Sequence, residues 1–234
     1  MNEQQRLSVF QAQTQNVREL KKAWAQVNRQ INASLVHQNN KAVEINTKLL
    51  ALIYCALAEA IFSKLIHTPH GLSLNEIDQI RNVSNQKGVK FGWTKCAELA
   101  MQSVEGEKSN HEPNVLKKLS SLIEQFIFDP SLMRNKLAHG QWCIALNHDN
   151  TAVNLDITKE VARCTIIDLY RRENALERLA AIIEDMVESP NKAHRRDYWT
   201  HLCELEDAAL KMSAWTIESK VKQLTVKRSY MARS

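Results

Sequence analysis

Two side chains that can act on a phosphodiester, Arg134 and His139, stand five positions apart in the second half of the chain. A histidine can accept or donate a proton near neutral pH. An arginine can hold a phosphate or stabilise negative charge that develops on it. RNA supplies its own nucleophile, the 2′-hydroxyl, once a base removes its proton. The pair therefore favours RNA cleavage by proton transfer, for which no metal is needed.

The residues around the pair extend the pattern. Asn135 follows the arginine, Ala138 precedes the histidine and Gly140 follows it. This string resembles the R-N-x-x-x-H signature of HEPN domains, a superfamily of helical bundles that contains many metal-independent endoribonucleases. The resemblance implies that His139 manages protons, that Arg134 steadies the phosphorane-like transition state, and that Asn135 orients either one. The implied product carries a 2′,3′-cyclic phosphate.

The resemblance also implies partners. Two chains of this superfamily usually pair so that both motifs face one groove, so we expect a homodimer that acts on RNA. Many members act in antiphage defence or as toxins, which adds an antitoxin or another regulatory protein as an expected partner. Some relatives are not nucleases, and the alternative is a non-catalytic helical interaction or RNA-binding module, such as an antitoxin or effector-complex subunit. In a purely structural alternative, Arg134 is a solvated helix residue and the helix dipole favours His139 at a C-terminus.

Composition indicates an all-α protein. The 234 residues include only 5 Gly and 4 Pro, and Leu, Ala, Glu, Lys, Gln and Arg are abundant, as in helical proteins. We expect a HEPN-like bundle over residues 1–188, with a small β-hairpin at about 141–155. Residues 189–234 would form a helical extension with a basic tail, as part of the same domain.

The first two helices differ in pattern. Apolar residues at helical spacing between Val17 and Leu35 mark one face of a long first helix. A second helix, at about 41–66, is apolar on nearly all sides, which predicts the buried middle of the bundle. Glu59 interrupts that surface and must find a partner there or face solvent. Arg134 is a candidate partner.

Capping and turn residues predict the central elements. Ser73 to Glu76 has the capping-box pattern and predicts a short helix to about 82. Residues 85–92 are interpreted as a loop, residues 93–104 as a helix, and Pro113 as part of the first turn of the next helix.

The motif helix is expected to start at Asp129-Pro130 and to end near His139. Five residues at about 100° each put Arg134 and His139 about 140° apart on an ideal helix. Either the helix unwinds at His139, or the two side chains reach one cleft from its edges.

Short β-like runs in residues 141–146 and 151–155 predict the hairpin. Trp142 would form its core, or stack on a base. Asp156 or Thr158 would then cap a long helix to about 188, which Ser189-Pro190 breaks. The last helix would run from about 193 into the tail.

Basic residues gather near the C-terminus. The formal net charge of the chain is +5, and residues 220–234 contain Lys220, Lys222, Lys227, Arg228 and Arg233 but no acid. Such a tail can bind RNA through its phosphates, or it can be a solvated end.

A second basic cluster lies further upstream. Arg195 and Arg196 precede Tyr198 and Trp199, a pattern that single-stranded RNA binders use. The alternative is a half-buried helix start.

The remaining patterns point to a cytoplasmic protein without a cofactor or metal. The five cysteines form no C-x-x-C pair, which argues against a zinc ribbon and fits reduced thiols in the cytoplasm. His67 and His70 lack a nearby third ligand. The N-terminus has no apolar signal core, and the longest apolar run, residues 49–58, is too short to span a bilayer. We therefore expect no membrane partner.

Overall fold

The fold is all-α, as composition predicts. The computed structural model describes residues 1–105 and 110–231, and this part of the chain contains helices but no strand. Ten α-helices and two π-helical turns follow one another: α1 (Glu3–Val36), α2 (Asn40–Ile66), α3 (Leu74–Lys87), α4 (Val89–Met101), α5 (His111–Ile123), η1 (Glu124–Phe128), α6 (Asp129–Ala138), α7 (Leu155–Arg163), α8 (Ile166–Glu188), η2 (Pro190–His194), α9 (Arg195–Ser213) and α10 (Ile217–Met231).

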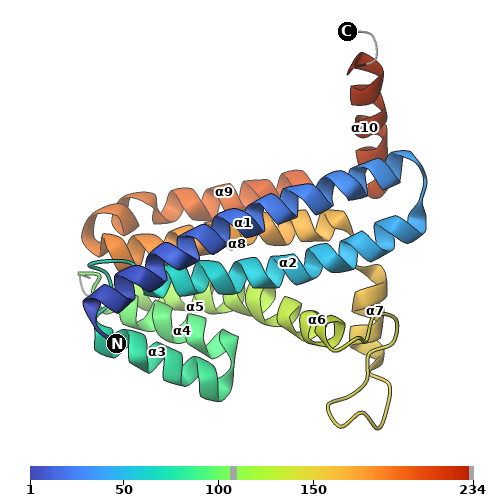
Figure 1. Cartoon of the computed structure of the whole chain (residues 1–234). Helices are drawn as coiled ribbons and strands as arrows, with labels where there is room; N and C mark the ends of the chain where they lie inside the picture. The colour runs from blue at the N-terminus through green and yellow to red at the C-terminus, as the bar shows by residue number, and fades with distance from the viewer. Residues whose placement is uncertain (106–109, 232–234) are drawn as a thin grey trace.

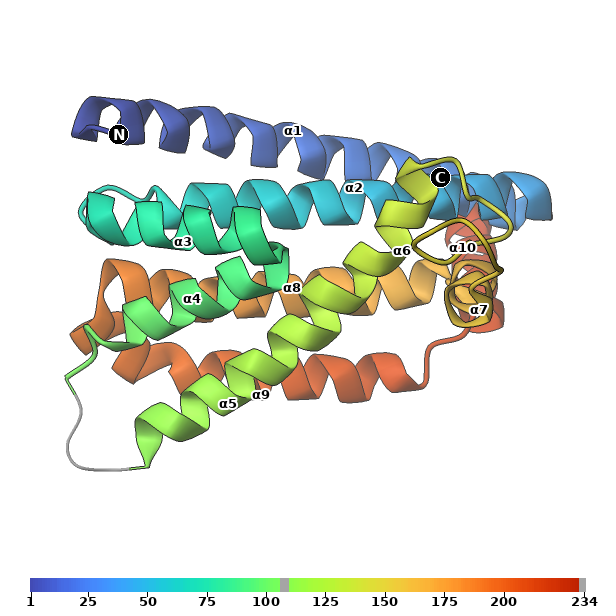
Figure 2. The same cartoon turned by 90° about the horizontal axis from the view of Figure 1, so that it is seen from below.

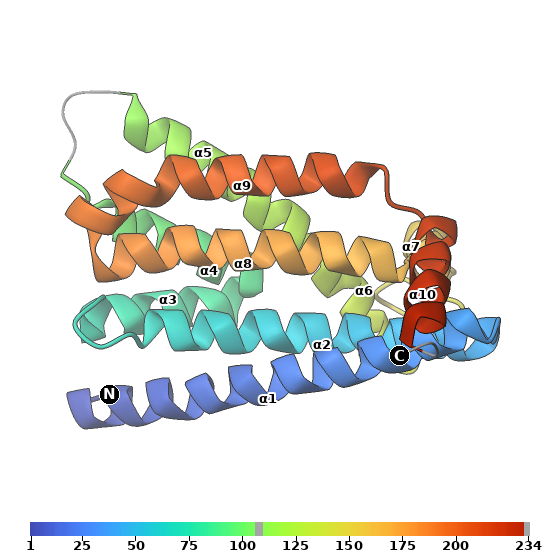
Figure 3. The ribbon, with the colours of Figure 1, turned by 90° about the horizontal axis from the view of Figure 1, so that it is seen from above.

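The helices form two layers. In the view from above, α1, α2, α8 and α9 lie side by side in that order along roughly one direction (Figure 3). Helices α3, α4, α5 and α6 cover one face of this layer (Figures 1 and 2). Helix α10 crosses one end of the bundle and projects from the opposite face (Figure 1). The α6 helix and the C-terminal helix are therefore on different sides of the molecule.

Helix α2 is the central element, as its all-round apolar pattern predicts. It packs against α1, α6 and α8, and Leu50, Tyr54 and Leu57 on it are almost fully buried. By length and composition α2 is also apolar enough to cross a membrane, although 56% of its most apolar stretch is buried inside the bundle. The core helix of a helical bundle commonly has this length and composition.

Local capping explains several helix starts. Ser73 accepts from the backbone N–H of Glu76 while the Glu76 side chain accepts from the Ser73 N–H, so the predicted capping box is confirmed. Asn2 and Thr165 form the equivalent reciprocal caps of α1 and α8. Each box satisfies donors that the first turn of a helix leaves without intrahelical partners.

The predicted loop at 85–92 is wrong, because one residue suffices to reverse the chain there. Helix α3 continues to Lys87, and α4 begins at Val89. Between them Gly88 has φ +101°, a left-handed value that glycine adopts without strain. Gly92 lies inside α4, where a Cβ would come within 2.8 Å of the Ser84 Cβ, so it permits the close approach of the two helices. In the sequence alone, both glycines are typical of a loop.

The predicted β-hairpin is also wrong. Residues 139–154 form a loop with a single isolated antiparallel bridge, between Leu146 and Val153. Side chains accept hydrogen bonds from several backbone N–H groups of this loop. The Asn147 Oδ1 accepts from the N–H groups of Thr151 and Ala152, and the Thr158 hydroxyl accepts from the N–H of Ala145. A lone two-stranded ribbon is marginally stable, and these side-chain bonds replace the ladder that a hairpin would need.

The predicted long helix at 156–188 is divided in two. Asn154, rather than Asp156 or Thr158, caps α7, which ends before Cys164, and Thr165 caps α8. After α8, the predicted break at Ser189-Pro190 is a π-helical turn that leads directly into α9. The expected last helix is likewise two helices, α9 and α10.

Candidate functional site

The motif helix α6 continues a bent helix and does not begin at a cap. The helix α6 starts at Asp129-Pro130, as predicted, but Asp129 is not its N-cap, because Asp129 has α-helical backbone angles and follows the π-helical turn η1 without interruption. Pro130 has no N–H and cannot donate to the carbonyl of Phe126 four residues earlier. The buried Tyr54 hydroxyl donates to that carbonyl at 2.6 Å. A side chain from α2 thus compensates for the proline and fixes the start of α6.

Arg134 points from the middle of α6 toward α2. Its guanidinium forms an ion pair with the Glu59 carboxylate, and its Nη1 donates to the Asn135 Oδ1 at 3.2 Å. The Glu59 side chain is 51% exposed and that of Arg134 is 32% exposed. Glu59 therefore pairs with Arg134, its candidate partner from the sequence. It also faces solvent, because the pair lies at the edge of the bundle.

Arg134 and Asn135 line an open cleft of about 320 Å³. Its wall comes from three places in the chain: Glu59 on α2; the α3–α4 junction; and α6 with the residue before it. The lining residues are Glu59, Lys87, Gly88, Val89, Lys90, Phe128, Ser131, Leu132, Arg134 and Asn135. Three of these side chains are basic and one is acidic, so the cleft suits an anionic ligand.

Lys87 and Lys90 are the functional candidates that sequence reasoning missed. They flank the Gly88 turn, and only the packing of α3 and α4 beside α6 brings them to Arg134. Lys90 forms an ion pair with Glu124 and lies 5.1 Å from the centre of the Phe128 ring. Nothing in the linear sequence relates residues 87–90 to residue 134. The one available signal was a pair of lysines on either side of a glycine.

His139 stands apart from this cleft. It follows the last residue of α6 with φ −93° and ψ 19°, so the helix ends at it, and Gly140 continues in a left-handed conformation with φ +79°. The side chain is exposed, and within residues 1–105 and 110–231 no hydrogen bond or ion pair joins it to Arg134. Arg134 thus lines the cleft, whereas His139 is not among the residues that line it.

A thiol near Arg134 is held in its neutral form. Cys55 on α2 is buried, and its Sγ lies 3.6 Å from the Pro130 carbonyl oxygen. Burial raises the pKa of this thiol to about 12, and the positive charge of Arg134 offsets only part of that rise. A thiol that stays protonated is a poor nucleophile, so Cys55 serves packing. Trp142 is likewise structural: it packs against the core and donates to the Leu137 carbonyl at 2.9 Å.

The basic cluster at the start of α9 lies far from the cleft. Arg195 is exposed, and Arg196 forms an ion pair with its neighbour Asp197. Tyr198 is buried while Trp199 is 64% exposed, so only one of the two aromatic side chains is available to stack on a base. This segment lies at the opposite end of the bundle from α10 (Figure 1).

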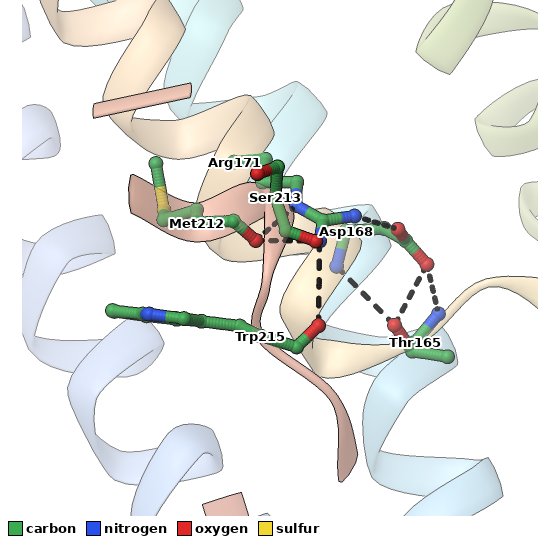
Figure 4. Close-up of polar contacts among 6 residues, drawn as sticks. All are labelled: Thr165, Asp168, Arg171, Met212, Ser213 and Trp215. Atoms are coloured by element: carbon green, nitrogen blue, oxygen red, sulfur yellow. Dashed lines mark hydrogen bonds and ion pairs between the residues drawn. The ribbon is translucent and has the colours of Figure 1, made fainter. Parts of the chain in front are cut away.

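The C-terminal basic helix α10 is held in place by α8. The Arg171 side chain donates to the carbonyls of Met212, Ser213 and Trp215 at the α9–α10 junction, and it pairs with Asp168 (Figure 4).

Lys220 of α10 also contacts α8, because its Nζ donates to the Tyr170 hydroxyl at 3.0 Å. Lys222, Lys227 and Arg228 are exposed, whereas Arg233 lies outside the described residues. Three of the five tail cations are thus exposed on a helix that projects away from the cleft.

Comparisons with known proteins add no relative: no family model, no curated protein and no solved structure matches the chain. The described residues contain no group of three or more His, Cys, Asp and Glu side chains placed to hold a metal ion.

Proposed function

We propose that the protein is a metal-independent endoribonuclease of the HEPN type. In this reaction the 2′-hydroxyl attacks the adjacent phosphorus, the 5′-oxygen leaves, and a 2′,3′-cyclic phosphate remains. His139 transfers the protons, Arg134 stabilises the charge on the phosphoryl oxygens, and Asn135 orients the guanidinium to which it is hydrogen-bonded. The observation that carries the proposal is the position of Arg134 in an open, mainly basic cleft.

The carboxylate of Glu59 supports Arg134 in this scheme. It holds the guanidinium at the rim of the cleft before RNA binds. Exposed ion pairs of this kind are weak, because water screens both charges. A phosphate can therefore replace Glu59, fully or in part, as the partner of the guanidinium at a small cost in free energy. A deeply buried arginine would instead have favoured a purely structural role.

A second copy of the chain is proposed to complete the site, because His139 lies outside the cleft that Arg134 lines. Six large apolar side chains are exposed around α6: on α2, which packs against it, on α6 itself, and in or just after the following loop. They are Ile45, Leu49, Leu132, Ile144, Val153 and Leu155. A two-fold axis at this face would bury them and bring both copies of the motif together.

A substitution in this face tests the dimer. Ile144→Asp places a charge in the proposed interface, and we expect it to shift the protein from dimer to monomer by light scattering and to lower the cleavage rate. Leu210→Asp is the matched control, because Leu210 is 73% exposed on α9. A wild-type monomer with full activity per chain would rule the shared site out.

The reaction itself is tested with labelled RNA and purified protein in EDTA. We expect cleavage, products with 2′,3′-cyclic phosphate ends, and no cleavage where the nucleotide 5′ to the bond is 2′-deoxy. Loss of activity in EDTA with recovery in magnesium would contradict the mechanism.

The second candidate is a non-catalytic RNA-binding or interaction module. The separation of His139 from the cleft favours it, because a basic cleft can bind RNA without cutting it. Binding without cleavage, in the dimer and in clean preparations, would decide for this alternative.

A further inference from the structure

We propose that the α3–α4 junction is an RNA-binding subsite, in which Lys87 and Lys90 hold a phosphate next to the one that Arg134 holds. This inference rests on the proposed function for the identity of the ligand, but the two lysines that it adds lie outside the motif. No feature of the R-N-x-x-x-H pattern involves residues 87–90.

The geometry places the two lysines on the cleft wall formed by the α3–α4 junction, with Arg134 on the wall formed by α6. Lys87 is exposed and forms no ion pair with any described residue, so its charge is available. Lys90 is held over the Phe128 ring and paired with Glu124, so its ammonium group is already positioned. A single strand that passes through the cleft would meet positive charge on both sides.

The carboxylates in and beside the cleft act as weak competitors for these cations. Glu124 is 42% exposed and pairs with Lys90, and Glu59 pairs with Arg134 in the same way. A phosphate that binds must replace these carboxylates, which are exposed and therefore screened. Removing a carboxylate should strengthen RNA binding, whereas removing a lysine should weaken it. A surface with only general attraction for polyanions would also respond to charges outside the cleft.

Phe128 gives the subsite a preference for nucleotides over other anions. Its half-buried ring lines the cleft beneath Lys90. Aromatic rings in single-strand sites pack against bases while cations hold the backbone. The volume of about 320 Å³ lies at the lower end of the range for small-ligand pockets, which suits one nucleotide unit.

The test measures binding of a fluorescent single-stranded 2′-O-methyl RNA, which the protein cannot cut because the nucleophile is blocked. We expect the double variant Lys87→Ala/Lys90→Ala to bind about tenfold more weakly at low salt. The slope of log affinity against log salt should fall by about 1.4, since each phosphate contact to a single strand contributes about 0.7. Glu124→Gln should bind up to about fivefold more tightly.

Lys95→Ala is the matched control, because Lys95 lies on α4 outside the cleft lining. It should bind like the wild type. Phe128→Leu keeps an apolar side chain and should weaken binding of the oligonucleotide but not of inorganic pyrophosphate.

The outcomes separate this inference from the proposed function. Wild-type affinity and salt slope in the double lysine variant would overturn the subsite, even if the protein cleaves RNA. Equal losses in the double variant and in Lys95→Ala would also overturn it, because the attraction would then be general. Weaker binding in the double variant alone, in a protein that does not cleave RNA, would support the subsite and reject the nuclease.

Discussion

Two π-helical turns lead into two of the helices that carry candidate RNA-binding residues, and they place side chains in opposite surroundings. η1 precedes α6 and its motif, and η2 precedes α9 with Arg195 and Arg196. A proline adjoins each turn: Pro130 follows η1 closely, and Pro190 begins η2. Such turns often occur at functional sites, so the backbone alone would rank the two regions equally.

The side chains distinguish them. Beyond η1 the polar groups are ion-paired, half-exposed and gathered around an open cleft. At η2 the polar side chain is fully buried: His194 is 0% exposed, and neither of its ring nitrogens has a hydrogen-bond partner in the described structure. The rings of His111 and Tyr198 pack around it, with centroids 5.8 and 5.3 Å away.

Of these two irregular helix segments, only the one whose neighbours leave room for a ligand adjoins a cleft. The buried Tyr54 satisfies the backbone at η1 from within, so the outer side of α6 stays open. At η2 the aromatic side chains fill the space themselves. We therefore expect changes at α6 to affect activity, and changes at His194 to affect stability.

The largest expected effect is on cleavage. His139→Ala should lose about 10²-fold or more in rate, the usual scale for a positioned acid–base group, and Arg134→Ala a similar amount through lost charge stabilisation. Both side chains are partly or fully exposed, so thermal stability should change little. His194→Phe should instead change thermal stability and leave the cleavage rate at the wild-type value. Wild-type rates in both motif variants would make the motif structural and remove the contrast between the two turns.

The next effect is a pH dependence of stability at His194. Burial and the neighbouring His111 lower the pKa of His194 to about 4, from an ordinary 6.5. Between these values the unfolded chain binds a proton that the folded chain does not, so the free energy of unfolding falls as pH falls. The loss is up to about 1.4 kcal/mol per pH unit, and it stops below about pH 4.

Urea unfolding at pH 7, 6 and 5 measures this dependence. In His194→Phe the pH dependence should be smaller by that amount, because the group that titrates is gone. The Arg134→Ala variant serves as the control and should keep the wild-type slope. If the free energy of unfolding of His194→Phe depended on pH as in the wild type, His194 would not be the group responsible, and solvent would reach the η2 region more than its packing indicates.

Sequence reasoning was right where a local pattern determines the structure. The all-round apolar pattern predicted the central place of α2, and the Ser73 capping box predicted the start of α3. It failed where tertiary packing overrides a local signal. Asp129-Pro130 correctly marks the start of α6, but it predicts an N-cap that is not formed, because Tyr54 from another helix lets the chain continue from η1 into α6. Residues 87–90 could not be connected with Arg134, because only the packed bundle brings them together.

The smallest expected effect concerns α10, and it compares affinity with chemistry. Lys222, Lys227 and Arg228 are exposed on a helix that projects from the face opposite to α3–α6 (Figure 1). Charge on such a projecting helix can add phosphate contacts but cannot orient a reacting bond. Replacing the three with Gln should weaken RNA binding a few-fold at low salt and lower the salt slope by about 2, with the chemical step unchanged.

Lys220→Gln is the control, because Lys220 is bound to Tyr170 and should affect stability rather than the salt slope. An unchanged salt slope in the triple variant would mean that α10 serves a protein partner or only solubility, and RNA contacts would then be confined to the cleft side of the molecule.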